Sequence, residues 1–370
     1  MSFFEEVEKI HHQISLPCAI LIAIKGRVER IGNKFENRIG SAFPNGDQSV
    51  LIFSPGGTGK TTCMNKIYNG LKLQNNASFI ESGGMATSIG LLELFQENAN
   101  CMAFIDEMDW DNKDHLQLFK QVSNGKIYRQ KSGGDSSFNF NGMIVAATNS
   151  ITIPRGSKSE HLMATLDRFI VVRAEKASLD YNEILDNIIT GVKQEEDSVD
   201  WNLIADRINS DWDSELTEGE SSLIKRAWLE KQKECLDSTQ ENIRSMHRVK
   251  DCLLFVKRVS QSENVFNDDN LVKIFLKLVK DIVIVNKGNI AWMDFSERQI
   301  FTTVNTSIIP LSPKDILDIC EERGIPINRR TLQRKLLKMV DQGFLFKYSH
   351  GKYWNKSDFN DEDSNCLIKM

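Results

Sequence analysis

One segment of the chain reads Val50-Leu51-Ile52-Phe53-Ser54-Pro55-Gly56-Gly57-Thr58-Gly59-Lys60-Thr61-Thr62. An apolar run followed by glycines and Gly-Lys-Thr is typical of a loop whose backbone N–H groups surround the phosphates of a nucleotide. In such a loop Lys60 reaches the β- and γ-phosphates and the hydroxyl of Thr61 binds Mg²⁺, so we predict that residues 54–62 bind the phosphates of a nucleotide. Ser54 stands where a glycine is usual, which makes the first turn less free. The alternative is a glycine-rich turn that binds nothing.

The composition is that of an ordinary globular protein. The 370 residues are 41% hydrophobic and 26% charged, which suits two or three domains with cores of their own. Because the net charge is −5, any contact with nucleic acid must come from a local basic patch. The seven cysteines are dispersed without metal-ligand spacing, which favours reduced thiols in the cytoplasm and argues against a zinc site. The apolar run from Leu16 to Ile24 is too short to span a membrane.

Short apolar runs alternate with helical stretches in the first half of the chain. They are Val50–Phe53, Ala77–Ile80, Cys101–Ile105, Met143–Ala147 and Phe169–Val172. Runs that are apolar on both faces indicate strands of a parallel sheet covered by helices, so we predict an α/β fold. From Tyr181 to Lys287 the apolar spacing becomes helical, which predicts a second, all-helical domain.

These patterns divide the chain into six segments. We expect a helical N-terminal segment over 1–40, an α/β core over 41–178, a helical lid over 179–290, a linker over 291–310, a small module over 311–355 and an acidic tail over 356–370.

Polar side chains follow two of the predicted strands. Asp106 and Glu107 come directly after the third strand, and Asn149 follows the fourth. ATP hydrolysis requires one carboxylate at the Mg²⁺ ion and one that activates water, and Asp106 and Glu107 would take these roles in that order. Asn149 can orient the attacking water without adding negative charge. Each feature alone has an ordinary explanation, a chance Asp-Glu pair or an Asn in a turn. Downstream of a phosphate loop, together they favour an ATPase.

The segment 311–355 is predicted to fold as helix, break, helix and hairpin. Ser312-Pro313 begins the first helix, Gly324-Ile325-Pro326 breaks the chain, and the second helix covers Arg330–Asp341. This order resembles a winged helix-turn-helix domain. Nine lysines and arginines oppose five acidic residues in this module, and the second helix gathers on one face Arg329, Arg330, Arg334, Lys335 and Lys338. We predict that this face binds DNA; the alternatives are a merely solvated helix face or a hairpin that binds protein.

A β-hairpin is predicted between the acidic strand and the strand that ends in Asn149, with Ser132-Gly133-Gly134-Asp135 at its tip. A phosphate loop, an acidic pair and an Asn on successive strands resemble the AAA+ ATPases. A hairpin inserted before the Asn strand is similar to their helicase branch, which includes the minichromosome maintenance and superfamily 3 viral helicases. The resemblance implies hairpins that grip single-stranded DNA in the channel of a ring. Here the positive charge would come from Lys126, Arg129 and Lys131, with Tyr128 or Phe138 packing against sugar or base.

Leu166-Asp167-Arg168-Phe169 resembles the Ser-Arg-Phe arginine-finger motif of the minichromosome maintenance family, with Asp167 in place of the serine. The resemblance implies that Arg168 reaches the γ-phosphate bound by a neighbouring subunit. The alternative is a structural pairing of Arg168 with Asp167 or Glu160. Farther along, Ser245–Leu254 resembles the helix that carries the family's sensor 2 arginine. Arg248 is the candidate for this role, and Arg244 is near enough to compete.

The resemblance covers residues 48–280 and implies a minimal, helicase-like AAA+ protein. Such a protein would form a homo-oligomeric ring, a hexamer, that uses ATP and Mg²⁺ to translocate on single-stranded or forked DNA. It would act in the DNA replication of a virus, mobile element or cell. An alternative is an ATP-switched initiator or loader that binds DNA without unwinding it. A protein-remodelling AAA+ ATPase ranks last, because no aromatic-hydrophobic-glycine pore loop is recognisable.

Overall fold

The computed structural model divides the chain into two compact units. One comprises residues 1–152, 161–232 and 241–285, and the other comprises residues 153–160, 233–240 and 286–370. The structure describes residues 2–31, 49–54, 57–72, 79–82, 87–99, 101–108, 110, 112–131, 134–140, 142–149, 151, 157–175, 198–210, 215–235, 243–286, 289–348 and 351–355. Pro55 and Gly56 of the expected phosphate loop, Ser132 and Gly133 of the expected hairpin tip, and the expected tail over 356–370 lie outside these residues.

The first unit contains a five-stranded sheet in the order β2-β3-β6-β1-β7. The strands are β1 (Ser49–Phe53), β2 (Phe79–Ser82), β3 (Met102–Ile105), β6 (Met143–Thr148) and β7 (Phe169–Arg173). All neighbouring strands are parallel, and Leu51 lies opposite both Ala146 and Val171. The predicted α/β fold with a central parallel sheet is therefore confirmed.

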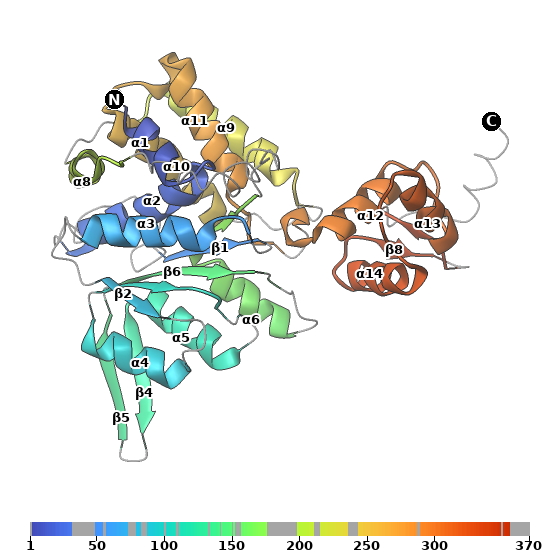
Figure 1. Cartoon of the computed structure of the whole chain (residues 1–370), viewed down its shortest axis with the longest axis horizontal. Helices are drawn as coiled ribbons and strands as arrows, with labels where there is room; N and C mark the ends of the chain where they lie inside the picture. The colour runs from blue at the N-terminus through green and yellow to red at the C-terminus, as the bar shows by residue number, and fades with distance from the viewer. Residues whose placement is uncertain are drawn as a thin grey trace, which may run out of the picture. The chain divides into compact units, whose positions relative to one another are not determined.

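Helices cover both faces of this sheet. They include α3 (Lys60–Lys72), α4 (Ser88–Glu97), α5 (Lys113–Ser123) and α6 (Ser157–Leu166). Helix α3 lies on one face, and α4 and α5 lie on the other (Figure 1). Every residue of β1, β3 and β6 is buried as a result, which explains why these strands are apolar on both faces.

A β-hairpin is inserted between α5 and β6. Its strands are β4 (Lys126–Lys131) and β5 (Gly134–Asn139), paired antiparallel from Lys126 opposite Asn139 to Lys131 opposite Gly134. The hairpin projects from the face of the sheet that α4 and α5 cover (Figure 1). Its register places the end of the ladder at the tip segment expected from the sequence.

The N-terminal segment forms two helices, α1 (Phe3–Ile10) and α2 (Ser15–Ile31). A capping box between Ser2 and Glu5 begins α1. Helix α2 contains the apolar run that starts at Leu16, and it packs against β1, β6 and β7 as well as against later helices. No helix among the described residues has the length and apolar composition of a membrane span.

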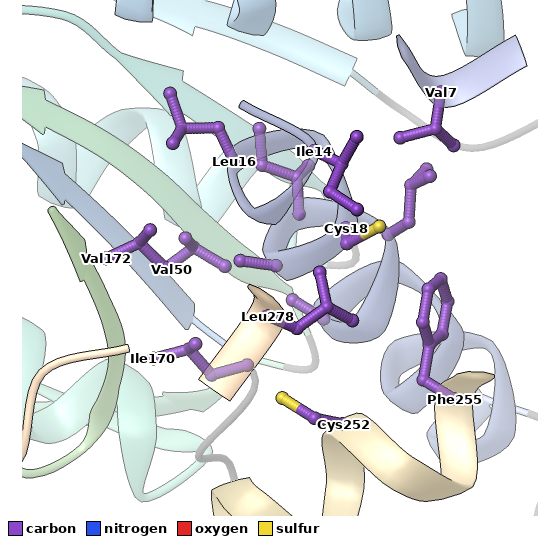
Figure 2. Close-up of a cluster of buried hydrophobic side chains, with 14 of the residues drawn as sticks. Val7, Ile14, Leu16, Cys18, Val50, Ile170, Val172, Cys252, Phe255 and Leu278 are labelled. Atoms are coloured by element: carbon purple, nitrogen blue, oxygen red, sulfur yellow. The ribbon is translucent and has the colours of Figure 1, made fainter. Parts of the chain in front are cut away.

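The helical part of the first unit shares one hydrophobic core with the sheet. Its helices are α8 (Trp201–Asn209), α9 (Glu218–Gln232), α10 (Ile243–Ser260) and α11 (Asp269–Asp281), with a short 3₁₀ helix η1 (Val265–Asn267). Figure 2 shows side chains from three parts of the chain in this core: Val7, Leu16 and Cys18 from α1 and α2, Val50, Ile170 and Val172 from the sheet, and Cys252, Phe255 and Leu278 from α10 and α11. The N-terminal helices therefore belong to the core that supports the sheet.

The second unit is a small helical module with a two-stranded ladder. It contains η2 (Ile290–Trp292), α12 (Phe295–Asn305), α13 (Pro313–Glu322), α14 (Arg329–Asp341), β8 (Phe346–Lys347) and β9 (Tyr353–Trp354). A capping box between Ser312 and Asp315 begins α13, and the side chain of Asn328 caps α14. Strands β8 and β9 pair antiparallel.

The linker expected over 291–310 differs from the structure, because most of it forms α12. This helix contributes Ile300, Phe301 and Val304 to the core of the second unit. A capping box formed by Asp294 and Glu297 begins this helix. The prediction of a linker considered only the weak apolar periodicity of the segment and overlooked this box. The module is therefore larger than the expected segment 311–355.

Candidate nucleotide-binding site

The candidate residues of the first unit gather at one edge of the parallel sheet. The loop after β1 carries Lys60 at the start of α3, Asp106 and Glu107 follow β3, and Asn149 follows β6. Strands β3, β6 and β1 are neighbours and run parallel, so their carboxyl ends meet. This edge of an open α/β sheet is the usual place for a ligand.

Lys60 is buried among oxygen atoms of this edge. Its Nζ donates to the backbone oxygen of Ser54 at 2.8 Å, to Ser54 Oγ at 3.3 Å and to Oδ1 of Asn149 at 3.3 Å. Burial lowers the pKa of Lys60, and the carboxylates of Asp106 and Glu107 oppose that shift. The ammonium group of Lys60 thus connects the candidate phosphate loop with Asn149, and the acidic pair acts on its charge.

Thr61 and Asp106 make the second contact between the loop and the strand ends. The hydroxyl of Thr61 donates to Oδ2 of Asp106 at 2.8 Å. A hydroxyl and a carboxylate are oxygen ligands of the kind that Mg²⁺ prefers, and protein Mg²⁺ sites commonly use one or two such groups with water and phosphate oxygens. Within the described ranges no group of three or more His, Cys, Asp or Glu side chains is placed to hold a metal ion. The hydroxyl of Thr61 and the carboxylate of Asp106 are ligand types that a nucleotide-bound Mg²⁺ would use.

The candidate phosphate loop has the backbone geometry that its glycines allow. Gly57 and Gly59 have φ values of 80° and 78°, in the left-handed region that favours glycine. The hydroxyls of Ser54 and Thr58 lie 2.6 Å apart and share a hydrogen bond across the loop. Ser54, the departure from the usual glycine, is thus buried and bonded within the loop. Thr62, the last residue of the predicted loop, lies in α3 with an exposed side chain.

Glu107 is exposed and has an uncommon backbone conformation. Its φ of 54° is left-handed, and its N–H donates to Oδ1 of Asp106 at 3.0 Å. A non-glycine residue in this region costs of the order of 1–3 kcal/mol, and such residues concentrate at functional sites. This left-handed residue directly follows Asp106, just after the end of β3.

The candidate arginines form a second group, around the turn between α6 and β7. Arg168 donates to the backbone oxygen of Ala164. Arg244 forms an ion pair with Asp167, with Nη1 and Oδ2 3.0 Å apart. Arg248 is buried and donates to the backbone oxygen of Asp167. The structure therefore brings both sensor 2 candidates to the residue that precedes the candidate arginine finger.

A further cation, which sequence reasoning missed, lies near Arg168. Burial lowers the pKa of Lys120, and the positive charge of Arg168 lowers it further. Lys120 Nζ also lies 3.3 Å from Nδ1 of His161. Its position in α5 gave no signal in the sequence, because the pairing depends on how α5 and α6 fold against the sheet. The turn thus has four cations around it, Lys120, Arg168, Arg244 and Arg248, and Asp167 compensates the charge of Arg244.

The hairpin candidates are described only in part. Lys126 and Tyr128 on β4 are exposed, and Lys126 Nζ lies 5.3 Å from the centre of the Tyr128 ring. Arg129 and Lys131 are residues of β4, but their side chains lie outside the described part of the chain. An exposed aromatic ring beside a lysine is a suitable surface for a nucleic-acid base and its phosphate.

The candidates in the second unit differ in their surroundings. Arg329, Arg330 and Arg334 on α14 are exposed. Lys335 is only 14% exposed and pairs with Asp294, and its Nζ lies 3.7 Å from Oε1 of Glu297. Lys338 pairs with the same Glu297 oxygen at 2.7 Å. The charge of Lys335 is therefore compensated inside the module, whereas the three arginines face solvent.

His11 contacts the candidate phosphate loop, and sequence reasoning missed it. Its Nε2 lies 3.0 Å from the backbone oxygen of Thr58, which is 47 residues later in the chain. No local pattern connects a histidine at the end of α1 with a loop after β1. Only the packing of the N-terminal helices against the sheet reveals the contact.

The comparisons with known proteins gave no match from which a function could be assigned. No protein-family model matches this chain. A search of curated proteins also gives no match.

Proposed function

We propose that this chain is an oligomeric, ATP-hydrolysing AAA+ protein of the helicase branch. The observation that carries the proposal is the pair of contacts at the sheet edge, Thr61 with Asp106 and Lys60 with Asn149. They join the phosphate loop to the ends of the two strands that are expected to supply the acidic pair and the water-orienting amide. A glycine-rich turn that binds no ligand would have no need for a lysine and a hydroxyl that contact Asn149 and Asp106.

The residues of the site have distinct tasks in this proposal. Lys60 exchanges its bonds to Ser54 for the β- and γ-phosphates of ATP. Thr61 and Asp106 would hold Mg²⁺, which would neutralise charge on the phosphate oxygens. Glu107 accepts a proton from the attacking water, and Asn149 orients that water. Catalysis of this type consists mainly of positioning and electrostatic stabilisation, which a rigid sheet edge supplies.

An oligomer is part of the proposal because of the basic turn around Arg168. In the proposed ring, a homohexamer, this turn faces the ATP of a neighbouring subunit, where Arg168 stabilises negative charge in the transition state. The contacts of Arg244 and Arg248 with Asp167 support a shared role, since they fix the turn from the side of α10.

Single-stranded or forked DNA is the proposed partner of the ring. The hairpin β4–β5 precedes the strand that ends in Asn149, and it exposes Lys126 and Tyr128. The second unit supports a DNA-binding role independently, because two helices, α13 and α14, precede a two-stranded ladder in the order of a winged helix, with Arg329, Arg330 and Arg334 exposed on α14. We propose that ATP hydrolysis drives translocation on DNA during replication.

An ATP-switched initiator or loader remains the second candidate. The observation that favours it is the exposed arginine face of α14, because a module that recognises duplex DNA suits a protein that assembles on a defined site. Strand displacement on a forked DNA separates the two candidates. Unwinding that depends on ATP supports the helicase, whereas ATP hydrolysis and duplex binding without unwinding support the loader.

The ATPase proposal is tested by measuring ATP hydrolysis with and without single-stranded DNA. We expect Lys60→Ala to reduce hydrolysis at least about 100-fold, because it removes the charge that contacts the phosphates. Lys113→Ala, a change at an exposed lysine of α5, is the matched control and should leave the rate unchanged. Glu107→Gln should bind ATP normally but lose turnover by about 10²- to 10⁴-fold, as expected for a general base. Equal rates for wild type and Lys60→Ala would exclude this site.

A further inference from the structure

The N-terminal segment makes a direct bond to the phosphate loop. His11 caps the C-terminal end of α1, is 7% exposed, and places Nε2 3.0 Å from the backbone oxygen of Thr58. A carbonyl oxygen can only accept a hydrogen bond, so Nε2 of His11 must carry the proton and donate it. The bond therefore defines which nitrogen of the ring is protonated.

The other ring nitrogen has a matching partner. The backbone N–H of Gln13 donates to Nδ1 of His11 at 3.0 Å, which requires a bare nitrogen, whereas the oxygen of Gln13 lies farther away, at 3.3 Å. Burial lowers the pKa of His11, which favours the neutral ring, although the hydrogen bond to Thr58 opposes the shift. Both contacts thus agree on a neutral imidazole with its proton on Nε2.

Gly59 allows this contact. A Cβ atom at Gly59 would lie 2.8 Å from Nε2 of His11, closer than Cβ atoms come to other heavy atoms in proteins, and the φ of 78° is itself strained for other residues. The ring of His11 therefore packs directly on the backbone of the Thr58–Gly59 peptide. Because a trans peptide is planar, its C=O and N–H point in opposite directions. Fixing the C=O of Thr58 toward His11 turns the N–H of Gly59 away from it.

The segment that carries His11 is held at several points. The side chain of Gln13 donates to the backbone oxygen of Arg173 at 2.9 Å and accepts from the N–H of Glu175 at 2.8 Å, both just at the end of β7. Ser15 Oγ donates to Oδ2 of Asp281, at the end of α11, at 2.6 Å. These bonds fix the segment relative to the sheet and to the helical part of the same unit.

We propose that His11 is a positioning residue for the nucleotide: by holding the Thr58–Gly59 peptide plane, it keeps the Gly59 N–H directed at the triphosphate. The inference rests on the proposed ATP site and adds to it a residue from the N-terminal helices. His11 does not touch the phosphates in this arrangement. It acts through the loop backbone, whose N–H groups bind the anion.

The proposal predicts a specific pattern in the affinity of the full chain for a fluorescent ATP analogue with Mg²⁺. His11→Leu fills the site without a donor and should weaken binding about 3- to 10-fold, the effect of losing one hydrogen bond. His11→Gln places an amide N–H near the position of Nε2 and should restore most of that affinity. Glu8→Gln, at an exposed residue of α1, is the matched control and should bind like wild type.

The outcomes separate this inference from the ATP site itself. Lys60→Ala should bind the analogue much more weakly than wild type, because it removes the charge that contacts the phosphates. If His11→Leu then binds like wild type, or if His11→Gln and His11→Leu are weakened equally, the positioning role is wrong although the ATP site stands. If the wild type binds no ATP analogue, the proposed site and this inference both fail. Nitrogen NMR of ¹⁵N-histidine-labelled wild type tests the bond without any variant. We expect His11 as the neutral Nε2–H tautomer, and a bare Nε2 would rule out the bond to Thr58.

Discussion

The hydroxyl of Thr61 donates a hydrogen bond of 2.8 Å to Oδ2 of Asp106, a residue 45 positions later in the chain. The bond connects the first turn of α3 with the end of β3. Strand β6 lies between β1 and β3 in the sheet, so the contact depends on the parallel order of all three strands. It brings together the hydroxyl and the carboxylate that the proposed Mg²⁺ site requires.

Removing this hydroxyl should change the Mg²⁺ requirement of ATP hydrolysis. We expect Thr61→Val, which keeps the shape of the side chain, to raise the Mg²⁺ concentration at half-maximal rate by about 10-fold or more, as is typical when a group that supports a metal is lost. Thr61→Ser keeps the hydroxyl and should stay close to wild type. A Mg²⁺ titration at fixed ATP measures the shift, and identical curves for the two variants would argue against a role for Thr61 at the metal.

Arg168→Ala should lower turnover much more than ATP affinity, because the proposed role of Arg168 is to stabilise the transition state in a neighbouring subunit. Arginine fingers contribute about 10³-fold or more to the rate. Mixing Arg168→Ala with Lys60→Ala should recover part of the activity, since mixed rings contain sites with an intact Lys60 beside an intact Arg168. The control Arg226→Ala, at an exposed arginine of α9, should be fully active. A mixture with no recovered activity, from proteins that do assemble, would contradict a role between subunits.

The fold and most of the site could be predicted from local patterns. Strands that are buried on both faces must be apolar throughout, so runs such as Val50–Phe53 and Met143–Ala147 were visible in the sequence. Asp106 and Asn149 follow such runs directly, and parallel strands bring their ends to one edge. The prediction of a parallel α/β sheet is therefore confirmed, while the chemistry assigned to the site stays a prediction.

The remaining contacts join residues that no spacing rule connects. His11 meets Thr58 because α1 and α2 pack into the core of the sheet, and Arg244 meets Asp167 because α10 folds against the same unit. The prediction of a linker over 291–310, where the structure has α12, was wrong for a different reason. Its apolar residues are few and widely spaced, so the capping box at Asp294 was the clearer signal.

The two basic neighbours Arg334 and Lys335 should differ in their effect on DNA binding. Arg334 is exposed on α14, so Arg334→Ala should weaken binding to duplex DNA about 10-fold. It should also lower the slope of log affinity against log salt concentration by about one, the effect of losing one phosphate contact. Lys335 is paired with Asp294 and Glu297, so Lys335→Ala should weaken DNA binding less and instead destabilise the second unit by about 1–3 kcal/mol. Fluorescence anisotropy at several salt concentrations, together with thermal unfolding, measures both. If Arg334→Ala and Lys335→Ala lose the same DNA affinity, the ion pairs of Lys335 do not keep it from contacting DNA, and the prediction is wrong.

Breaking the buried pair of Lys257 and Glu220 should destabilise the helical part of the first unit. Their side chains are 1% and 0% exposed, with Nζ and Oε2 2.7 Å apart. Lys257→Met leaves Glu220 buried without its cation and should lower the free energy of unfolding by about 3–5 kcal/mol. Lys225→Met, at an exposed lysine of α9, is the matched control. The double variant Lys257→Met/Glu220→Leu should recover part of the loss, because it leaves no unpaired charge.

The same pair gives a prediction about pH. Burial raises the pKa of Glu220, but hydrogen bonds from Lys257 and from the N–H groups of Thr217 and Val265 outweigh it, so the pKa lies below its ordinary value of 4.5. The ionised carboxylate therefore stabilises the fold fully above pH 4.5, and this contribution is lost as the pH falls below that value. In urea unfolding, wild type should lose more stability than Glu220→Gln between neutral pH and values below 4.5. If Glu220→Gln loses as much stability as wild type over this pH range, the carboxylate of Glu220 is not the cause of the loss.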